Sequence, residues 1–387
     1  MAEAVIVATA RTPIGRAFKG SLIEARPDDM GGFIVDALME KVPEVDRASV
    51  EDVLIGCANG AGEQSMNVAR NISLLAGLPD TVPGTTVNRF CASSLQTIRM
   101  AYHAIKAGEG DTYVAGGVES VSRTGGRAFK KEDMNPRFRK GEPGFINDVY
   151  IPMGMTAENV AAQYGVPRER LDEFAKLSQD RATAAQENGF FEREITPYKL
   201  PNGDVVAKDD CPRAGTTLEK LATLPPAFKE DGVVTAGNAC PLNDGAAAVL
   251  VMSEDKARSL GLQPLARILG SSVSGLAPEI MGVGPIVAIQ KLLEQTGRKI
   301  SDVDVVELNE AFAAQVLPIC DETGISIEDQ LNPHGGAIAL GHPFGQTGAR
   351  IMTTLVNDLQ TLDKSIGIET MCVGGGQGMA MMIERLT

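Results

Sequence analysis

The stretch GTTVNRFCASS, residues 84–94, predicts a short β-strand that passes through a sharp turn into a helix. The helix is indicated by apolar residues three or four positions apart, at Leu95, Ile98, Ala101 and Ile105. Because strands that lead into helices are the building units of α/β proteins, this stretch predicts the α/β class.

Cys91 lies at the turn, beside the first unpaired N–H groups of the predicted helix. Their partial positive charge favours a thiolate, so we expect a lowered pKa and a nucleophilic sulfur. The alternative is a small buried cysteine that fills a strand–helix junction, and this segment alone does not decide between the two.

The α/β pattern continues along the chain. The expected strands span residues 4–8, 52–56, 85–88, 112–116, 265–269, 303–308, 366–372 and 379–384. The strand at Asp52 precedes Cys91 by almost as many positions as the strand at Asp302 precedes His342, and in both cases a turn rich in small residues opens a helix. This similarity suggests a duplicated unit, with coincidental α/β spacing as the alternative.

Residues 120–238 are richer in charge and are expected to form an inserted subdomain.

The composition is that of an ordinary globular protein, with 43% hydrophobic and 22% charged residues in 387 positions. The formal net charge of −14 argues against binding to nucleic acids or anionic membranes, which require a basic surface. No apolar run approaches the roughly 20 residues of a membrane span. The N-terminus is acidic where a secretory signal is basic. We therefore expect a cytoplasmic protein without membrane insertion.

The six cysteines are far apart and show no CxxC spacing, so neither a zinc site nor a disulfide framework is expected. Reduced thiols are typical of the cytoplasm. The only histidines are His103, His334 and His342, which leaves few candidates for an imidazole base. His103, inside the helix after Cys91, is interpreted as structural.

Three further segments carry residues that are suited to chemistry. His342 lies among glycines before Pro343, so we expect it at the tip of a strand, where it could exchange protons, although a buried structural role is the alternative. Cys372 is expected at a strand end, beside backbone N–H groups of a glycine run that could hold an oxyanion. Asn309 follows the strand 303–308, where the sites of α/β proteins gather, but alone it is more typical of a helix N-cap.

The motifs VNRFCASSLQ, NEAFA, GGAIALGHPFGQTG and CVGGGQG, in this order, resemble those of the thiolase family. The segments GNACPLNDGAAAV and PMGMTAENVA fit the same family, so the resemblance covers essentially the whole chain. It implies a five-layered α-β-α-β-α fold of two duplicated halves with an inserted loop domain. The implied division is residues 1–119 for the N-terminal half, 120–240 for a CoA-binding loop domain, 241–263 for the completion of the N-terminal half and 264–387 for the C-terminal half.

The resemblance also implies a role for each site residue. Cys91 matches the acylated nucleophile, His342 its activating base and Cys372 the acid/base at the substrate Cα. Asn309 matches the residue that, with the His342 position, orients the donors of one oxyanion hole. The N–H groups of Cys91 and Gly374 match a second oxyanion hole. No metal and no permanently bound cofactor are implied, because coenzyme A is a substrate.

Four residues are candidates for binding coenzyme A. Arg213, Met153 and Phe312 match positions that line the CoA channel, with the arginine against the adenine. Cys240 stands where the family usually has a serine that hydrogen-bonds the pantetheine, and a thiol donates only weakly, so that contact is in doubt. His334 replaces a common Asn and is interpreted as structural support rather than as a further base.

A basic cluster contrasts with the acidic composition of the chain. It consists of Arg127, Lys130, Lys131, Arg137, Arg139 and Lys140. The cluster either attracts the phosphates of CoA or belongs to a subunit interface, and the sequence leaves both alternatives open.

The implied activity is that of an acetyl-CoA C-acyltransferase. Such an enzyme cleaves a 3-ketoacyl-CoA with CoA, through an acyl-cysteine, to acetyl-CoA and a shortened acyl-CoA. Pro152-Met153-Gly154 resembles the thiolases of fatty acid β-oxidation, whereas the condensing type usually has His before the Met. Ketoacyl synthases use one Cys with two His, so Cys372 favours a thiolase.

Two other functions stay open. One is an acetyl-CoA C-acetyltransferase, which condenses two acetyl-CoA molecules to acetoacetyl-CoA, and the other is a non-catalytic thiolase-like scaffold subunit. The expected partners are 3-ketoacyl-CoA, acetyl-CoA and CoA. We expect a homodimer or homotetramer that could associate with hydratase/dehydrogenase subunits. The length and branching of the acyl chain, and the choice between dimer and tetramer, do not follow from the sequence.

Overall fold

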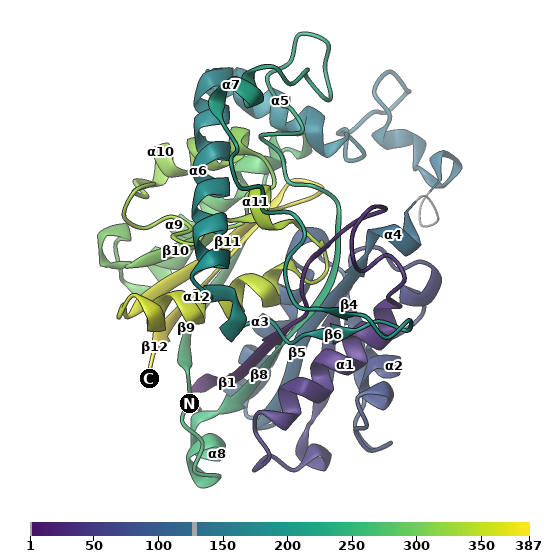
Figure 1. Ribbon diagram of the computed structural model, residues 1–387, viewed down its shortest axis with the longest axis vertical. Coiled ribbons are helices and arrows are strands. Elements are labelled where there is room, and N and C mark those ends of the chain that lie inside the picture. The colour runs from purple at the N-terminus through teal and green to yellow at the C-terminus, as the bar shows by residue number, and fades with distance from the viewer. Residues whose placement is uncertain (1, 126–129) are drawn as a thin grey trace.

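The structure is a computed structural model that describes residues 2–125 and 130–387 (Figure 1). It contains two half-sheets, one from each half of the chain. The strands of the first are β1 (Ala4–Arg11), β3 (Asp52–Gly56), β4 (Gly84–Val87), β5 (Thr112–Ser120) and β8 (Asn243–Ser253). Those of the second are β9 (Ala266–Gly275), β10 (Val305–Leu308), β11 (Ile366–Val373) and β12 (Gln377–Arg385). The short strand β2 (Gly15–Arg16) pairs with β8, and β6 (Tyr198–Lys199) pairs with β7 (Val205–Val206).

Four strands of each half-sheet have the same topology. The first half-sheet has the order β4-β3-β5-β8-β1, in which β4-β3 and β3-β5 are parallel pairs and the other pairs are antiparallel. The second has the order β10-β11-β12-β9, in which β10 and β11 are parallel and the other pairs antiparallel. β1 also pairs with β9 and so joins the half-sheets. The shared topology confirms the predicted duplication.

Helices cover the outer face of each half-sheet and fill the space between them. α1 (Pro27–Glu40) and α2 (Val68–Leu75) pack on the first half-sheet. α3 (Ser93–Ala107) and α12 (Thr347–Thr361) lie between the half-sheets and share an apolar core with both. α9 (Gly284–Thr296) and α10 (Ala313–Thr323) cover the second half-sheet. These are the five layers that the resemblance to the thiolase family implies (Figure 1).

Helix α3 forms where the spacing of its apolar residues predicts a helix. Leu95, Ile98, Ala101 and Ile105 are all buried on one face. The helix ends at Gly108, whose φ of +75° is the left-handed conformation that commonly terminates helices.

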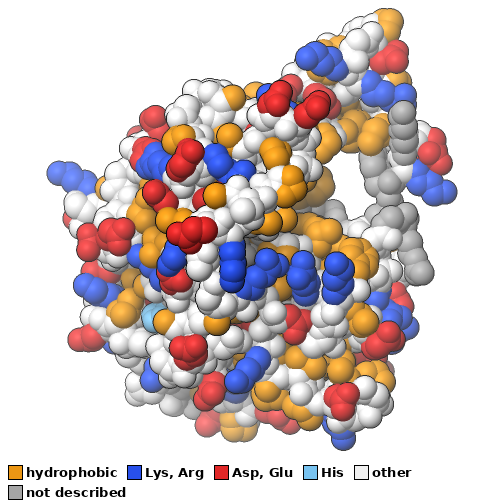
Figure 2. All heavy atoms as spheres, turned by 45° about the horizontal axis from the view of Figure 1, so that its top comes forward, with side chains coloured by type: hydrophobic (Ala, Val, Ile, Leu, Met, Phe, Trp, Pro, Cys, Tyr) orange, Lys and Arg blue, Asp and Glu red, His pale blue; other side chains and the backbone are white. Residues whose placement is uncertain are grey.

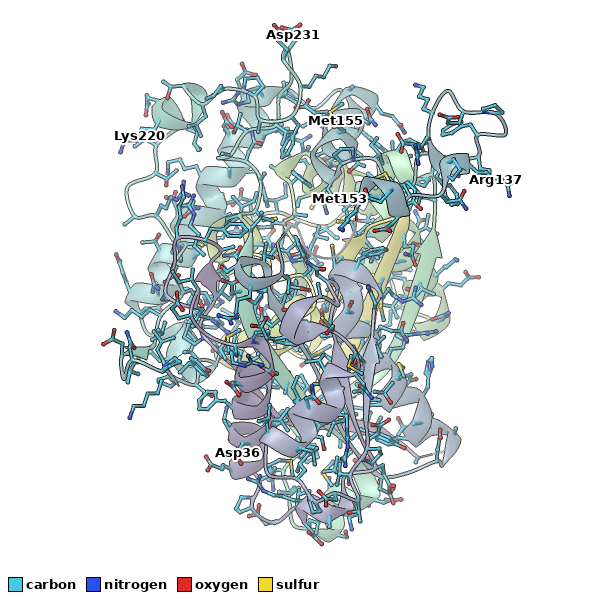
Figure 3. All side chains as sticks on the ribbon, turned by 90° about the vertical axis from the view of Figure 1, so that its right-hand side faces the viewer. Asp36, Arg137, Met153, Met155, Lys220 and Asp231 are labelled. Carbon is cyan, nitrogen blue, oxygen red and sulfur yellow. The ribbon has the colours of Figure 1, made fainter. Side chains whose placement is uncertain are left out.

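The inserted segment leaves the first half-sheet after β5 and returns at β8. Its helices are α4 (Val121–Thr124), α5 (Met153–Tyr164), α6 (Arg168–Glu187) and α7 (Leu218–Ala222). Within the described residues, the remaining α-helices are α8 (Glu254–Ser259) and α11 (Ala337–Leu340). α5, α6 and α7 lie over the upper part of the molecule in Figure 1, and Lys220 and Asp231 mark the outer end of the segment in Figure 3. None of the helices within residues 2–125 and 130–387 combines the length and apolar character that a membrane crossing requires.

Strand β8 was absent from the strands expected from the sequence. Its residues, NDGAAAVLVMS, include Asn, Asp, Gly and Ala, which are weak strand formers. They form a strand because β8 lies between β1 and β5 and is buried along its whole length. Small side chains fit such a position, which local propensity does not reveal.

A buried ion-pair network ties β1 to the inserted segment. Arg11 is fully buried and donates hydrogen bonds to Glu194 at 2.8 Å and to both carboxylate oxygens of Asp209 at 2.8 and 3.0 Å. Asp209 also accepts from the backbone N–H of Ile14 at 2.7 Å. Removal of Arg11 would leave two buried carboxylates without their cation.

We predict that Arg11→Leu strongly destabilises the protein. Uncompensated buried charge typically costs about 3–5 kcal/mol, so the midpoint of urea unfolding should fall sharply. The control is Arg170→Leu, which removes an exposed bidentate pair with Asp321 and should cost no more than about 1 kcal/mol. Equal shifts in the two variants would contradict the role of the buried network.

Candidate active site

Cys91 lies in the 3₁₀ turn η3 (Phe90–Ala92), between β4 and α3. Phe90 has a φ of +47°, which is unusual for an aromatic residue and indicates local strain of the kind found at functional sites. Side chains hold the turn in place. Phe90 N–H donates to Asn88 Oδ1 at 2.8 Å, and the Ser93 hydroxyl accepts from Arg89 N–H at 2.9 Å and donates to the Phe90 carbonyl at 2.7 Å.

The pKa of Cys91 differs from the expectation. Burial raises the pKa of the thiol to about 11, although the backbone N–H groups of Gly374 and of Cys91 itself face the sulfur and lower it. The nearby carboxyl group of Glu119 raises it further. The expected lowering was therefore wrong, because loss of hydration outweighs the backbone N–H groups. At neutral pH, Cys91 is a thiol that needs a base.

His342 lies in the loop between α11 and α12 and not at the tip of a strand, as the sequence suggested. It is almost fully buried, and its backbone N–H donates to Asn243 Oδ1 at 2.9 Å. Gly341 before it has a φ of +108°, and a Cβ there would lie 2.5 Å from the Asn243 side chain. Burial, together with the Arg350 guanidinium, lowers the pKa of His342 to about 3, so the imidazole is neutral at physiological pH.

The contacts of Thr347 define the tautomer of His342. Thr347 Oγ1 lies 2.6 Å from His342 Nδ1 and 2.7 Å from the carbonyl oxygen of Pro343. The carbonyl can only accept, so both contacts are hydrogen bonds only if the hydroxyl donates to it and Nδ1–H donates to the hydroxyl. Nε2 is then unprotonated and free to accept a proton.

Asn309 lies directly after β10 and is fully buried. Its side-chain Nδ2 is 3.4 Å from His342 Nε2, and its backbone N–H donates to the Thr370 carbonyl on β11 at 3.0 Å. Asn309 Oδ1 has no hydrogen-bond partner among the described residues. The N-cap of α10 is Phe312, so the local interpretation of Asn309 as a helix cap was wrong.

Cys372 is the penultimate residue of β11 and is fully buried. Its thiol donates to Gln315 Oε1 at 3.1 Å. Burial and the nearby Cys91 thiol raise the pKa of Cys372 above its usual range. Gly374 follows β11, and its N–H faces the sulfur of Cys91.

The carboxyl end of β11 is the common neighbour of the predicted catalytic residues. Cys372 lies on β11, and Gly374 directly follows it. The Thr370 carbonyl of β11 accepts a hydrogen bond from the backbone N–H of Asn309, and the Asn309 side chain faces His342. The structure therefore brings four widely separated segments of the sequence together, as predicted. The site thus contains the thiols of Cys91 and Cys372, the neutral imidazole of His342 and several N–H donors.

A cleft of about 350 Å³ adjoins this place and is lined by two of the predicted CoA-binding residues, Arg213 and Cys240. Cys240 N–H donates to the Ala311 carbonyl at 3.0 Å, which places the cleft wall next to the segment that carries Asn309. The Phe228 ring lines the cleft and meets the Phe312 ring edge-on, with centroids 6.0 Å apart.

The other two predicted CoA-binding residues, Met153 and Phe312, are not among the residues that line this cleft. Met153 begins α5 and packs against the same apolar core as Phe312. Gly154 beside it leaves room for Phe228, since a Cβ there would lie 2.2 Å from that ring. Phe312 therefore contacts the cleft wall through Phe228.

The remaining histidines lie outside the site. His334 Nδ1 is 2.5 Å from Asp358 Oδ1, and its ring stacks on Phe190 with centroids 3.6 Å apart. Burial lowers the pKa of His334 to about 4. These contacts agree with the structural interpretation of His334. His103 is exposed on α3, next to Tyr102.

Sequence reasoning missed three residues that hold the site together, Thr347, Gln315 and Asn243. Thr347 orients the imidazole, Gln315 accepts from Cys372, and Asn243 holds the backbone of His342. All three lie within or just after the family motifs, which was the available signal, but only the folded chain shows their contacts.

Part of the predicted basic cluster, Arg127 and the side chain of Lys131, lies outside the described residues. Arg137 lies at the outer edge of the molecule in Figure 3, apart from Met153. On the face shown in Figure 2, Lys and Arg side chains form a row below a hollow with hydrophobic walls. Attraction of CoA phosphates by the cluster stays a prediction.

Comparisons with known proteins agree with this geometry. Family models described as "Thiolase, N-terminal domain" and "Thiolase, C-terminal domain" match residues 4–255 and 262–385. A "Beta-ketoadipyl-CoA thiolase" of Acinetobacter baylyi is 48% identical over 100% of both chains. A "3-ketoacyl-CoA thiolase" of Bacillus subtilis is 43% identical over 99% of this chain and 100% of its own. 

The crystal structure of the Bacillus anthracis acetyl-CoA acetyltransferase superimposes with a TM-score of 0.91 at 42% identity, covering 100% of this chain and 99% of that one. The fold, the site and these similarities agree over the full length of the sequence. The chain belongs to the thiolase family.

Proposed function

We propose that this protein cleaves a 3-ketoacyl-CoA with CoA through an acyl group on Cys91. The observation that carries the proposal is the meeting of Cys91, His342 and Cys372 around the end of β11, with Nε2 of the imidazole unprotonated. Sulfur suits the reaction because it is a good nucleophile toward the ketone and later a good leaving group.

In the first half-reaction, His342 Nε2 takes the proton of the Cys91 thiol while the sulfur attacks C3 of the substrate. The negative oxygen that forms at C3 is held by the N–H groups of Cys91 and Gly374. The C2–C3 bond then breaks, and the electron pair passes to the acetyl-CoA enolate. This enolate takes the proton of the Cys372 thiol, which leaves acyl-Cys91, a Cys372 thiolate and protonated His342.

In the second half-reaction, the Cys372 thiolate takes the proton of the CoA thiol. The CoA thiolate attacks the acyl group, and the Cys91 sulfur leaves and recovers its proton from His342. Cys91, His342 and Cys372 all return to their starting protonation states, because the proton that Cys372 gives to acetyl-CoA is replaced by the proton of the CoA thiol, so no external acid or base is consumed. The thioester oxygen of the enolate, which forms in the first half-reaction, accepts hydrogen bonds from Asn309 Nδ2 and from the protonated Nε2 of His342.

For the substrate, we propose a 3-ketoacyl-CoA whose acyl chain ends in a carboxylate, of the 3-oxoadipyl type. The support is the relative named "Beta-ketoadipyl-CoA thiolase", which is 48% identical over both full chains. Coenzyme A would lie in the cleft of Arg213 and Cys240, next to the pair of Phe228 and Phe312. The six free thiols suit a reducing compartment such as the cytoplasm.

Linear 3-ketoacyl-CoA substrates of fatty acid β-oxidation are the second candidate. They are supported by Pro152-Met153-Gly154 at the start of α5 and by the relative named "3-ketoacyl-CoA thiolase". Condensation of two acetyl-CoA molecules uses the same residues in reverse and is supported only by the name of the similar crystal structure.

We predict that Cys91→Ser lowers the thiolysis rate by at least about 10³-fold, because it removes the nucleophile. Mass spectrometry of the parent mixed with substrate should show an acyl group on the peptide that contains Cys91. The control is Cys320→Ser, which changes a buried thiol on α10 outside the site and should keep parental activity. An active Cys91→Ser variant would refute the mechanism.

A substrate panel tests the acyl specificity. We expect kcat/KM for 3-oxoadipyl-CoA to exceed that for linear 3-ketoacyl-CoA substrates of four to twelve carbons by at least about 10-fold, since a site that hydrogen-bonds a polar group of its substrate rejects analogues that lack this group. Highest activity with a long linear chain would favour β-oxidation, and highest activity in acetyl-CoA condensation would favour the synthetic direction.

The raised pKa of Cys91 predicts the pH dependence of its alkylation. Only the thiolate reacts with iodoacetamide, and below a pKa of about 11 its fraction rises about tenfold per pH unit. The labelling rate of Cys91 should therefore rise steadily from pH 7 to 9. A rate that levels off within this range would show that the thiolate is already stable, and Cys91→Ser provides the background of the other cysteines.

A further inference from the structure

We propose that Gln315 is a positioning residue that fixes the acid/base thiol of Cys372 relative to the Asn309 segment. Gln315 lies in the first turn of α10 and is fully buried. Its side-chain oxygen accepts from Cys372 Sγ at 3.1 Å, and its Nε2 lies 3.5 Å from the backbone carbonyl of Asn309. The Gln315 amide therefore contacts both the Cys372 thiol and the backbone of Asn309.

The chemistry of the contacts sets the orientation of this amide. The Asn309 carbonyl can only accept a hydrogen bond, so the NH₂ group of Gln315 must face it. Oε1 is then left to face Cys372, and it can only accept. The side chain therefore holds the Cys372 proton on the line between sulfur and Oε1, and keeps the thiol from rotating freely.

The backbone of Asn309 is held from both sides by this arrangement. Its N–H donates to Thr370 on β11 at 3.0 Å, and its C=O faces Gln315. Since Asn309 Nδ2 lies 3.4 Å from the catalytic imidazole, a shift of this segment would also move a donor of the site.

The neighbouring residues pack closely around the Gln315 side chain. Gly282 packs against Gln315, and a Cβ at that glycine would lie 2.9 Å from the Gln315 Cβ. Gln315 is fully buried, so bulk solvent does not reach the Cys372 thiol from this side.

This inference rests on the proposed function, because it assigns to Cys372 the two proton transfers of thiolysis. A misplaced thiol would slow these transfers and leave CoA binding and the reactivity of Cys91 intact. We expect Gln315→Leu to lower kcat by about 10- to 100-fold, with KM for CoA within about twofold of the parent. The iodoacetamide labelling rate of Cys91 should stay at the parental value.

Gln315→Glu separates positioning from a purely structural role. When protonated, the introduced carboxyl group can accept from Cys372 and donate to the Asn309 carbonyl, as the amide does. When ionised, it has no proton to donate to that carbonyl. The activity of this variant relative to the parent should therefore recover as the pH is lowered from 9 to 6, whereas the ratio for Gln315→Leu should stay low and constant.

The control is Gln330→Leu, which removes a half-buried glutamine that also donates to backbone carbonyls, those of Ile300 and Val303, but contacts none of the site residues. It should keep kcat near the parental value. If the parent shows thiolysis and both Gln315 variants behave as this control does, the inference fails. If the parent itself shows no thiolysis, the proposed function fails instead. Should Gln315→Leu not fold, the pH dependence of Gln315→Glu decides.

Discussion

The site depends on the close contact between the first turns of α3 and α12 in the middle layer. These turns follow Cys91 and His342, so their contact brings the nucleophile and the base into one region. A Cβ at Gly348 would lie 2.3 Å from the Leu95 nitrogen, and Ala349 N–H donates to Ser94 Oγ at 2.9 Å. Only glycine permits backbones to approach in this way.

Burial around this contact explains the unusual protonation states. The loop before α12 packs so tightly on the first half-sheet that a Cβ at Gly117 would lie 1.9 Å from the Gly345 carbonyl oxygen. Loss of hydration on burial disfavours every charged form. The pKa of the Cys91 thiol therefore rises, the pKa of His342 falls, and both groups rest uncharged. Charge then forms only during the reaction, next to preorganised N–H donors.

The inserted segment contributes both to the anchoring of the first half-sheet and to the wall of the cleft. Through Glu194 and Asp209 it binds the buried Arg11 of β1, and through Arg213 and Phe228 it lines the cleft beside the site. A single segment thus fixes the geometry of the first half-sheet and closes one side of the place where CoA would bind. Its anchoring to the core by buried charge gives the cleft a fixed position relative to Cys91.

The sequence by itself determined the α/β class and the duplication, and it predicted the residues of the site, because strand and helix periods and the motifs around Cys91 and His342 are local features. Strand β8 was missed, because its small residues become a strand only between two neighbours. The tertiary structure alone decided the protonation states and the contacts of Gln315 and Thr347. Burial and the meeting of distant segments, which no local pattern contains, set the pKa of a thiol and the partners of an amide.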